Sequence, residues 1–190
     1  MRKVVLSNMT TANGFFEGPT PGDIYWHHVD DEFFKEANSL LDSVDTLLFG
    51  RKTYQGMAEY WTSEAAKTDD PVITAKMNNY DKIVFSTTLD KAGWNKTRLI
   101  KTKVAEEMTK LKNQPGKDMV IFGSSDLASS FLEMGLLDEI RMFVNPIILG
   151  DGKPMFKGVR EKIELKLLNT RTFGNGNVMI VYEPIRKGKR

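Results

Sequence analysis

Short apolar runs and stretches of helical periodicity alternate through the first two-thirds of the chain. Residues 3–10 are predicted to form a first strand, and the segments 46–49, 82–85 and 118–122, each of which contains an unbroken apolar run, predict three more. Runs of this length are typical of strands buried on both faces of a parallel sheet. Strands that alternate with helices predict such a sheet, with right-handed crossover connections.

Apolar residues at helical spacing predict a first helix that begins after Asp30. Asp30 is a suitable N-cap, and the acidic residues that follow suit the positive end of the helix dipole. The apolar positions of this helix are Phe33, Phe34, Ala37, Leu40, Leu41 and Val44. Further helices are expected from Arg51 onward, over 103–113 and after Asp126.

The pattern changes after residue 137. A strand is expected at 140–144, and residues 163–173 and 177–184 then alternate apolar and polar positions around the turn at 174–176. That alternation and the turn together predict a hairpin. The fold class is therefore α/β, with a mostly parallel central sheet, flanking helices and a C-terminal antiparallel hairpin. With no linker or repeat in sight, we expect one domain over 1–190.

Composition and charge restrict the possible functions. The chain has 27 basic and 25 acidic residues and no cysteine. Balanced charge argues against a nucleic-acid partner, and the absence of a long apolar run or signal peptide argues against a membrane. We therefore expect a cytoplasmic protein without disulfides or thiolate metal sites. The basic tail at 186–190 is expected to be a solvated, frayed terminus.

Three predicted strand ends carry residues that suit anion binding. They are Gly50-Arg51-Lys52-Thr53, Ser86-Thr87-Thr88 and Gly123-Ser124-Ser125-Asp126. Ligands of open α/β sheets bind beyond the carboxyl ends of the strands, and the helix N-termini there present free N–H groups. Alternatively, each segment has a purely structural role, as a turn or a helix cap. The GxGxxG fingerprint of an ordinary Rossmann site is absent.

These same segments resemble a known family. Residues 47–54 look like the cofactor-binding strand and helix of dihydrofolate reductases, and residues 83–89 look like the strand that reaches the adenosine 2′-phosphate there. Residues 120–152 are the most specific and resemble the reductase domain of bacterial bifunctional riboflavin-biosynthesis proteins and its stand-alone relatives. Residues 11–15 resemble the Ser-Leu-Asp-Gly segment that follows the first strand of that domain. Together these segments cover nearly the whole chain.

The resemblance implies a dihydrofolate reductase-like fold and NADPH as the cofactor. In this reading Gly50, Arg51, Lys52 and Thr53 hold cofactor phosphate, and Ser86 and Thr87 face the adenosine 2′-phosphate. Gly123, Ser124, Ser125 and Asp126 cradle the pyrophosphate. Asn13 and Gly14 lie on the loop over the nicotinamide.

The sequence departs from the family pattern in three places. Gly123-Ser124 stands where family members usually have two glycines. Asn13 stands where the riboflavin-type enzymes usually have aspartate. The zinc deaminase domain that usually accompanies the reductase needs cysteine ligands, which this chain lacks.

The reaction needs a proton to accompany the hydride that the cofactor supplies. By the resemblance, Asp31 lies near the pterin-binding carboxylate of dihydrofolate reductases, so it is the candidate catalytic and substrate-binding residue. Alternatively, Asp31 is an ordinary acidic residue in the first turn of the helix. Trp26 either stacks on the substrate ring or belongs to the core. His28 is the alternative proton donor, and the adjacent His27 and His28 are not expected to bind a metal.

Three functions follow as hypotheses. The first is an NADPH-dependent reductase of the 5-amino-6-(5-phosphoribosylamino)uracil reductase type, which acts on a ribosylaminopyrimidine phosphate or a similar small heterocycle. The second is a dihydrofolate or dihydropterin reductase, although residues 55–71 lack the arginine that clamps a glutamate tail. The third is a non-catalytic NADPH-binding protein. The edge hairpin also makes a homodimer plausible.

Overall fold

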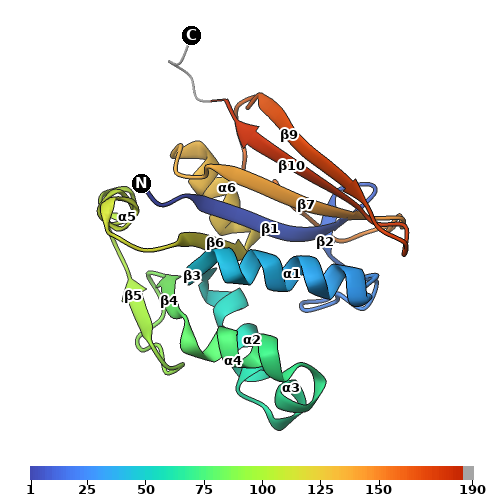
Figure 1. The fold of residues 1–190 in the computed structure, drawn as a ribbon. Coiled ribbons are helices and arrows are strands. Elements are labelled where there is room, and N and C mark those ends of the chain that lie inside the picture. Colours follow the sequence, from blue (N-terminus) through green and yellow to red (C-terminus); the bar gives the residue numbers. More distant parts are fainter. Residues whose placement is uncertain (186–190) are drawn as a thin grey trace.

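An eight-stranded sheet organises residues 1–185, which a computed structural model describes (Figure 1). The basic tail at 186–190 lies outside the described residues. Along the sheet the strand order is β5-β4-β3-β6-β1-β7-β10-β9. The strands are β1 (Val4–Thr11), β3 (Val44–Gly50), β4 (Asp81–Phe85), β5 (Thr97–Ile100), β6 (Asp118–Phe122), β7 (Glu139–Asn145), β9 (Leu165–Thr172) and β10 (Val178–Pro184).

The six strands from β5 to β7 are parallel, and β10 is antiparallel to both of its neighbours. This arrangement confirms the predicted fold class, with the C-terminal hairpin at one edge. Because the parallel strands share a direction, β1, β3, β4, β6 and β7 end at the same edge of the sheet. A separate short pair joins β2 (Phe15–Glu17) to β8 (Lys153–Pro154).

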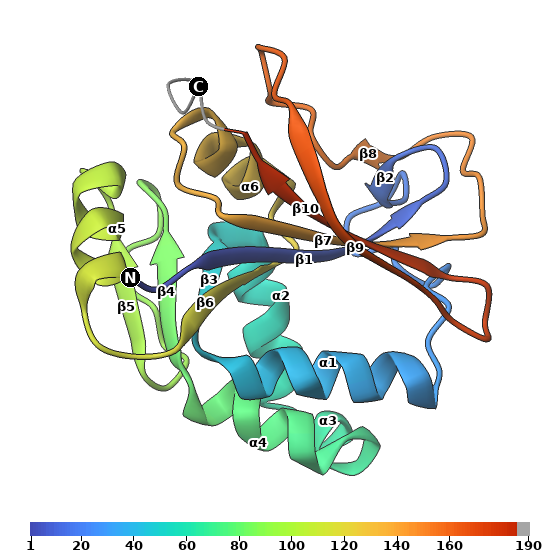
Figure 2. The same ribbon diagram turned by 45° about the horizontal axis from the view of Figure 1, so that its top comes forward.

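Helices cover both faces of the sheet (Figure 2). On one face, α1 (Asp31–Ser43), α2 (Arg51–Trp61) and α4 (Pro71–Asn79) pack on a core that includes Val5 and Phe49. On the other face, α5 (Val104–Asn113) and α6 (Ser125–Glu133) pack on a core that includes Val4 and Leu6. Neighbouring residues of β1 thus enter opposite cores, which explains why Val4, Val5 and Leu6 are all apolar. The short helix α3 (Glu64–Asp69) connects α2 to α4.

Helix α1 begins where the sequence predicts. Asp30 accepts a hydrogen bond from the Phe33 N–H at 2.8 Å and so caps the helix. Two of the six expected apolar positions differ. Phe34 is 39% exposed because it lies on the solvent side of the helix, and Val44 is extended backbone that opens β3. The helix therefore ends one residue earlier than the periodicity suggests.

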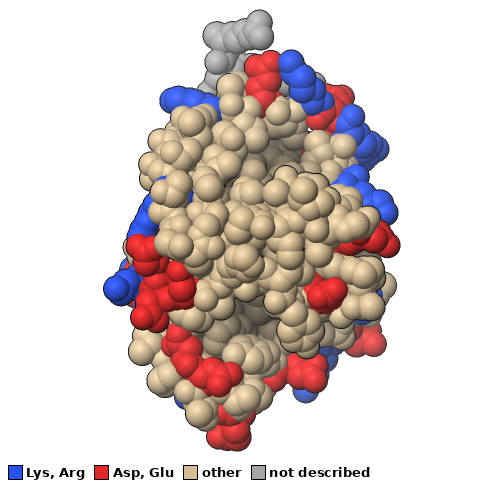
Figure 3. Space-filling view, turned by 90° about the vertical axis from the view of Figure 1, so that its right-hand side faces the viewer, with Lys and Arg blue, Asp and Glu red and all other residues tan. Residues whose placement is uncertain are grey.

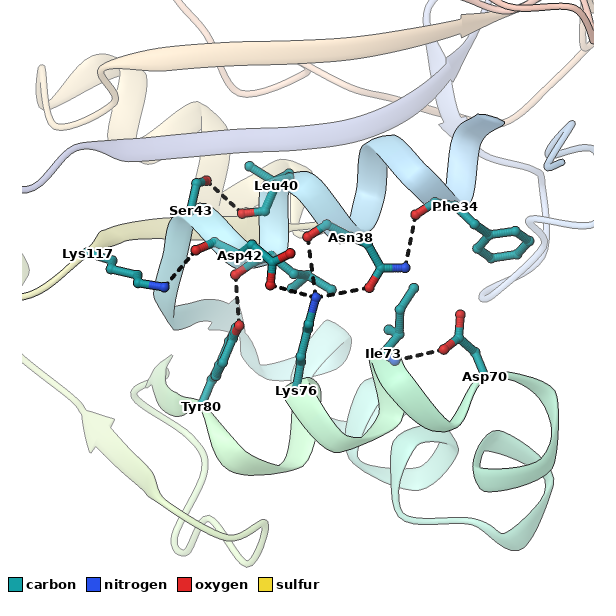
Figure 4. A network of polar contacts seen from close by, with 11 residues as sticks. Phe34, Asn38, Leu40, Asp42, Ser43, Asp70, Ile73, Lys76, Tyr80 and Lys117 are labelled. Carbon is teal, nitrogen blue, oxygen red and sulfur yellow. Dashed lines mark hydrogen bonds and ion pairs between the residues drawn. The ribbon is translucent and has the colours of Figure 1, made fainter. Parts of the chain in front are cut away.

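Polar contacts hold α4 against α1 (Figure 4). The Lys76 ammonium group donates to Asn38 Oδ1 at 3.1 Å and pairs with Asp42 at 2.8 Å. The Tyr80 hydroxyl donates to the Leu41 carbonyl at 2.8 Å. These contacts fix the solvent-facing side of α1 next to a helix that the sequence pattern did not predict. No helix within residues 1–185 combines the length and the apolar character that a membrane span requires.

Candidate functional site

An open cavity of about 790 Å³ lies at the carboxyl ends of β3, β4 and β6. All three of the predicted strand ends contribute to its wall, together with residues of α5 and α6. The predicted residues that line it are Gly50, Arg51, Lys52, Thr53, Ser86, Thr87, Ser124 and Asp126. The size is ordinary for a small-molecule or cofactor pocket.

Two helices begin at this cavity, and neither has a side-chain cap at its N-terminus. Helix α2 starts after Gly50, which has no side chain, and α6 starts after Ser124, whose side chain does not cap its own helix. The first N–H groups of both helices therefore stay available to a ligand, and the helix dipoles favour an anion.

The two cations at the start of α2 are not neutralised by carboxylates. Arg51 contacts only the Gln55 amide, at 3.4 Å, and Lys52 has no ion pair within the described residues. Positive charge without a protein partner, beside free N–H groups, is the arrangement expected for a phosphate site.

Ser124 joins two of the strand ends. Its hydroxyl accepts a hydrogen bond from the Gly50 N–H at 2.9 Å. Its backbone is left-handed, with φ 56°, directly after Gly123 at φ 64°. The chain thus keeps here the conformation that two glycines would adopt most easily, at a cost of about 1–2 kcal/mol for the serine.

A side chain at Gly123 would be strained, because its φ is 64° and a Cβ atom would lie 2.9 Å from Thr53 Cγ2. The turn after β6 therefore packs closely against the first turn of α2. The Gly123 N–H donates to Asn8 Oδ1 at 2.8 Å. The tight turn therefore borders the cavity, although Gly123 does not line it.

The Ser86 side chain has the geometry of a turn cap. Its hydroxyl oxygen accepts from the N–H groups of Thr88 at 3.2 Å and Leu89 at 3.0 Å. The hydroxyl also lies 3.4 Å from Thr88 Oγ1. Its proton can still turn toward the cavity, so the structural and the ligand-binding readings of this segment are compatible.

Further cations line the cavity that sequence reasoning missed. Lys101 follows β5, an unpredicted strand, and lies 3.9 Å from Asp90. Lys153 pairs with Asp126 at 3.5 Å and Arg160 with Glu133 at 3.8 Å. Recognition of β5 as a parallel strand would have placed Lys101 at this edge. The loop position of Arg160 gives no comparable signal.

Besides Gly123, three predicted cofactor residues lie off the cavity wall. The Asn13 amide is occupied by its neighbours: Nδ2 donates to the Leu149 carbonyl at 2.7 Å, and Oδ1 accepts from Thr11 Oγ1 at 2.8 Å. Gly14 lies in the turn after β1 with φ 86°. Ser125 is buried, and its hydroxyl has no hydrogen-bond partner within the described residues.

The two candidate substrate residues lie apart from the cavity. Asp31 is exposed and lines a shallow depression on the solvent side of α1, beside Phe34 and Asn38. Trp26 is only 8% exposed, and its Nε1 donates to the Asp23 carbonyl at 3.2 Å. Burial agrees with the core reading of Trp26. A role for either residue toward a substrate stays a prediction.

The two histidines differ in environment. His27 packs edge-on against Trp26 at 4.4 Å between ring centroids, and burial lowers its pKa to about 4. Its Nε2 atom is buried without a hydrogen-bond partner in the described chain. His28 is exposed, and its backbone is held by Asn145, Asn175 and Asn177. His27 is therefore a neutral imidazole over the physiological pH range.

Solved structures with this arrangement define the class of the fold. A putative riboflavin biosynthesis protein from Shewanella sp. PV-4 superposes with a TM-score of 0.73 at 20% identity, over 97% of this chain and 99% of that one. A dihydrofolate reductase from Enterococcus faecalis, complexed with NADP(H), gives 0.63 at 17% identity over 97% of each chain. The fold is dihydrofolate reductase-like.

The sequence comparisons define the family more narrowly. The model of the RibD C-terminal domain matches residues 2–179, so the chain belongs to that family. The uncharacterized protein YyaP of Bacillus subtilis is 36% identical over 185 residues, which is 95% of this chain and 94% of YyaP. The resemblance expected from residues 120–152 is thereby confirmed.

Proposed function

We propose that this protein is an NADPH-dependent reductase of the riboflavin-biosynthesis type, which reduces a small heterocyclic or ribosylaminopyrimidine substrate. The observation that carries the proposal is the shared cavity at the ends of β3, β4 and β6, where Arg51 and Lys52 have no carboxylate partner. The family supports it, and the structurally similar dihydrofolate reductase is complexed with NADP(H).

The residues present suit a doubly phosphorylated dinucleotide. Arg51, Lys52 and Thr53 would bind phosphate at the start of α2, and Ser86 and Thr87 would face the adenosine 2′-phosphate. Ser124 and Asp126 would border the pyrophosphate at the start of α6, next to Gly123 and Ser125. Asn13 and Gly14 would position the loop over the nicotinamide. These assignments use the free N–H groups and positive charges described above.

When bound, NADPH supplies a hydride to the carbon of a C=N or C=O bond, and a proton must reach the nitrogen or oxygen. We propose Asp31 as the source of that proton. Its carboxyl group has no partner within the described residues, so it is free to contact a substrate. Replacement of Asp31 by Asn should lower kcat without changing NADPH affinity.

We also propose that the protein works in the cytoplasm as a homodimer. Strand β9 has a free edge, and Leu165, Leu167 and Leu168 are exposed along it. An exposed apolar edge strand of this kind can pair with the same strand of a second copy.

Calorimetry with NADPH, followed by NADPH oxidation at 340 nm across a panel of heterocycles, tests the proposed function. We expect binding and turnover of at least one heterocycle. No NADPH binding would contradict the proposal. Binding without oxidation of any substrate would instead favour the non-catalytic alternative, and fast turnover of dihydrofolate would favour the dihydrofolate reductase alternative.

A further inference from the structure

The loop that follows β1 is bonded along its length to the segment around β8. The Ala12 N–H donates to the Ile147 carbonyl at 2.8 Å, and the Met155 N–H donates to the Gly14 carbonyl at 3.0 Å. Between these bonds, β2 and β8 pair antiparallel (Figure 2). We call residues 12–17 and 147–155 the paired segments. Figure 3 views the molecule from the end where they lie, and the surface is hollowed there.

Gly152 allows the paired segments to approach closely. A Cβ atom on it would lie 2.5 Å from the Glu17 carbonyl oxygen, so another residue here would push the segments apart. In the β2–β8 pair, the next residue, Lys153, then stands opposite Glu17. The turn at 150–152, which the sequence marks with two glycines, therefore sets Lys153 directly beside the loop after β1.

Lys153 connects the paired segments to the candidate cofactor cavity. Of these two segments, both of which the structure describes in full, Lys153 is the one residue that lines the cavity. Its Nζ atom lies 3.5 Å from Asp126 Oδ2, at the start of α6, and 5.2 Å from the centre of the Phe16 ring. One side chain therefore contacts both the proposed pyrophosphate site and the proposed nicotinamide loop.

The ion pair of Lys153 can be exchanged for a stronger one. The Asp126 side chain is 85% exposed, and an ion pair with so exposed a partner adds little to stability. The Asp126 carboxylate lies in the first turn of α6, where the helix dipole favours an anion. A pyrophosphate at the same helix start offers an ammonium group charge-assisted hydrogen bonds inside a partly enclosed cavity. Lys153 would therefore prefer the pyrophosphate to the carboxylate.

We propose that Lys153 is a positioning residue, which moves from Asp126 to the cofactor pyrophosphate and thereby fixes the loop over the nicotinamide. The inference rests on the proposed function, because it takes NADPH as the cofactor. In the free protein Lys153 is held by a solvated carboxylate. In the complex it holds the phosphate at one end and, through Phe16 and the β2–β8 pair, the loop at the other.

Calorimetry on the full-length protein tests the phosphate contact. Lys153→Met removes the charge and keeps a long, unbranched side chain. Because NADPH and NADH share the pyrophosphate, both should bind about tenfold more weakly, whereas Arg51→Ala should weaken NADPH far more than NADH. Lys153→Arg should keep most of the affinity. Lys157→Ala, which removes an exposed lysine on the same segment of chain but outside the cavity, should bind both dinucleotides like the unmodified protein.

Asp126→Asn should act in the opposite direction. This change frees Lys153 and removes a carboxylate from beside the pyrophosphate, so both dinucleotides should bind about two- to fivefold more tightly. Weaker binding of both would contradict the exchange of partners.

Hydrogen exchange reports on the loop itself, which a lost phosphate contact alone would not change. NADP⁺ is raised until each variant is saturated, as calorimetry defines. Exchange in residues 12–17 should then slow in the unmodified protein, in Lys153→Arg and in Lys157→Ala. In saturated Lys153→Met these residues should exchange as fast as in the free protein, while the amides at the start of α2 stay protected.

The outcomes separate this inference from the proposed function. Full protection of the loop in saturated Lys153→Met would overturn the inference and leave the proposed function standing, and so would a loss of affinity for NADPH without a matching loss for NADH. Failure of the unmodified protein to bind NADPH would instead overturn the proposed function, and the inference with it.

Discussion

Ser124 combines a strained backbone with a hydrogen bond that holds two binding turns together. Its φ of 56° disfavours any residue with a Cβ, yet its hydroxyl satisfies the Gly50 N–H. The sequence alone shows only that a serine stands where family members usually have a second glycine. Only the positions of Gly50 and Ser124 in space show what the serine provides.

Replacement of Ser124 separates these two effects. Ser124→Ala keeps the strain and leaves the Gly50 N–H without its partner, which should cost about 1–3 kcal/mol in the free energy of unfolding. Ser124→Gly loses the same hydrogen bond but relieves the backbone, and should be about 1 kcal/mol more stable than Ser124→Ala. Urea unfolding measures both. An alanine variant as stable as the glycine variant would contradict this account.

The buried side chain of His27 is expected to make the folded protein less stable at acidic pH. Burial lowers its pKa from 6.5 to about 4, so the unfolded chain binds the proton more readily. Stability should fall as the pH drops from about 6.5 toward 4, by on the order of 1 kcal/mol by pH 5. Urea unfolding at pH 7 and pH 5 should show a smaller loss in His27→Gln, which cannot take up this proton. An equal loss in both proteins would contradict the prediction.

At the scale of elements, the stability of α1 depends more on Asp30 than on its neighbour Asp31. Asp30 accepts from the Phe33 N–H, whereas Asp31 has no such bond. Asp30→Ala should therefore destabilise the protein by about 1 kcal/mol, and Asp31→Ala by at most a few tenths from the helix dipole. Thermal unfolding of the two variants provides the comparison. Equal destabilisation would show that Asp30 is not the cap.

The elements that sequence reasoning found are those with a strong local signal. Strands β3, β4 and β6 are buried on both faces and so appear as unbroken apolar runs. Strand β5 spans four residues, of which only Ile100 is buried, and its place is decided by pairing with β4. Helix α4 has few buried apolar residues. Its position depends on contacts that Lys76 and Tyr80 make with α1, which is distant in the sequence.

Residues of the candidate site could likewise be predicted only where they follow a strand with a strong local signal. Residues directly after buried strands, such as Arg51 and Ser86, were placed at the correct edge because parallel strands end together. Lys101 follows the unpredicted β5, and Arg160 comes from an irregular loop. The exposed position of Asp31 depends on the rotation of α1 about its axis, which a first-turn acidic pattern does not specify.

At the scale of the whole molecule, the free edge of β9 predicts a dimer. Leu167 is 55% exposed on this strand, and a lysine there should block edge pairing. Sedimentation velocity should find a dimer for the unmodified chain and a shift toward monomer for Leu167→Lys. Val72→Lys, on the equally exposed surface of α4, should leave the dimer intact. A monomeric unmodified chain would rule this assembly out.

The proposed cofactor binding depends on a phosphate-binding cavity shared by three strand ends, and a variant of Arg51 tests it most directly. Calorimetric titration of Arg51→Ala with NADPH and with NADH is compared with Arg98→Ala, which removes an exposed arginine paired with Glu107 outside the cavity. Loss of a charge-assisted phosphate contact should weaken NADPH about 10- to 100-fold and NADH far less. The Arg98 variant should bind both like the unmodified protein. Equal weakening of NADPH and NADH by Arg51→Ala, or none, would contradict the account.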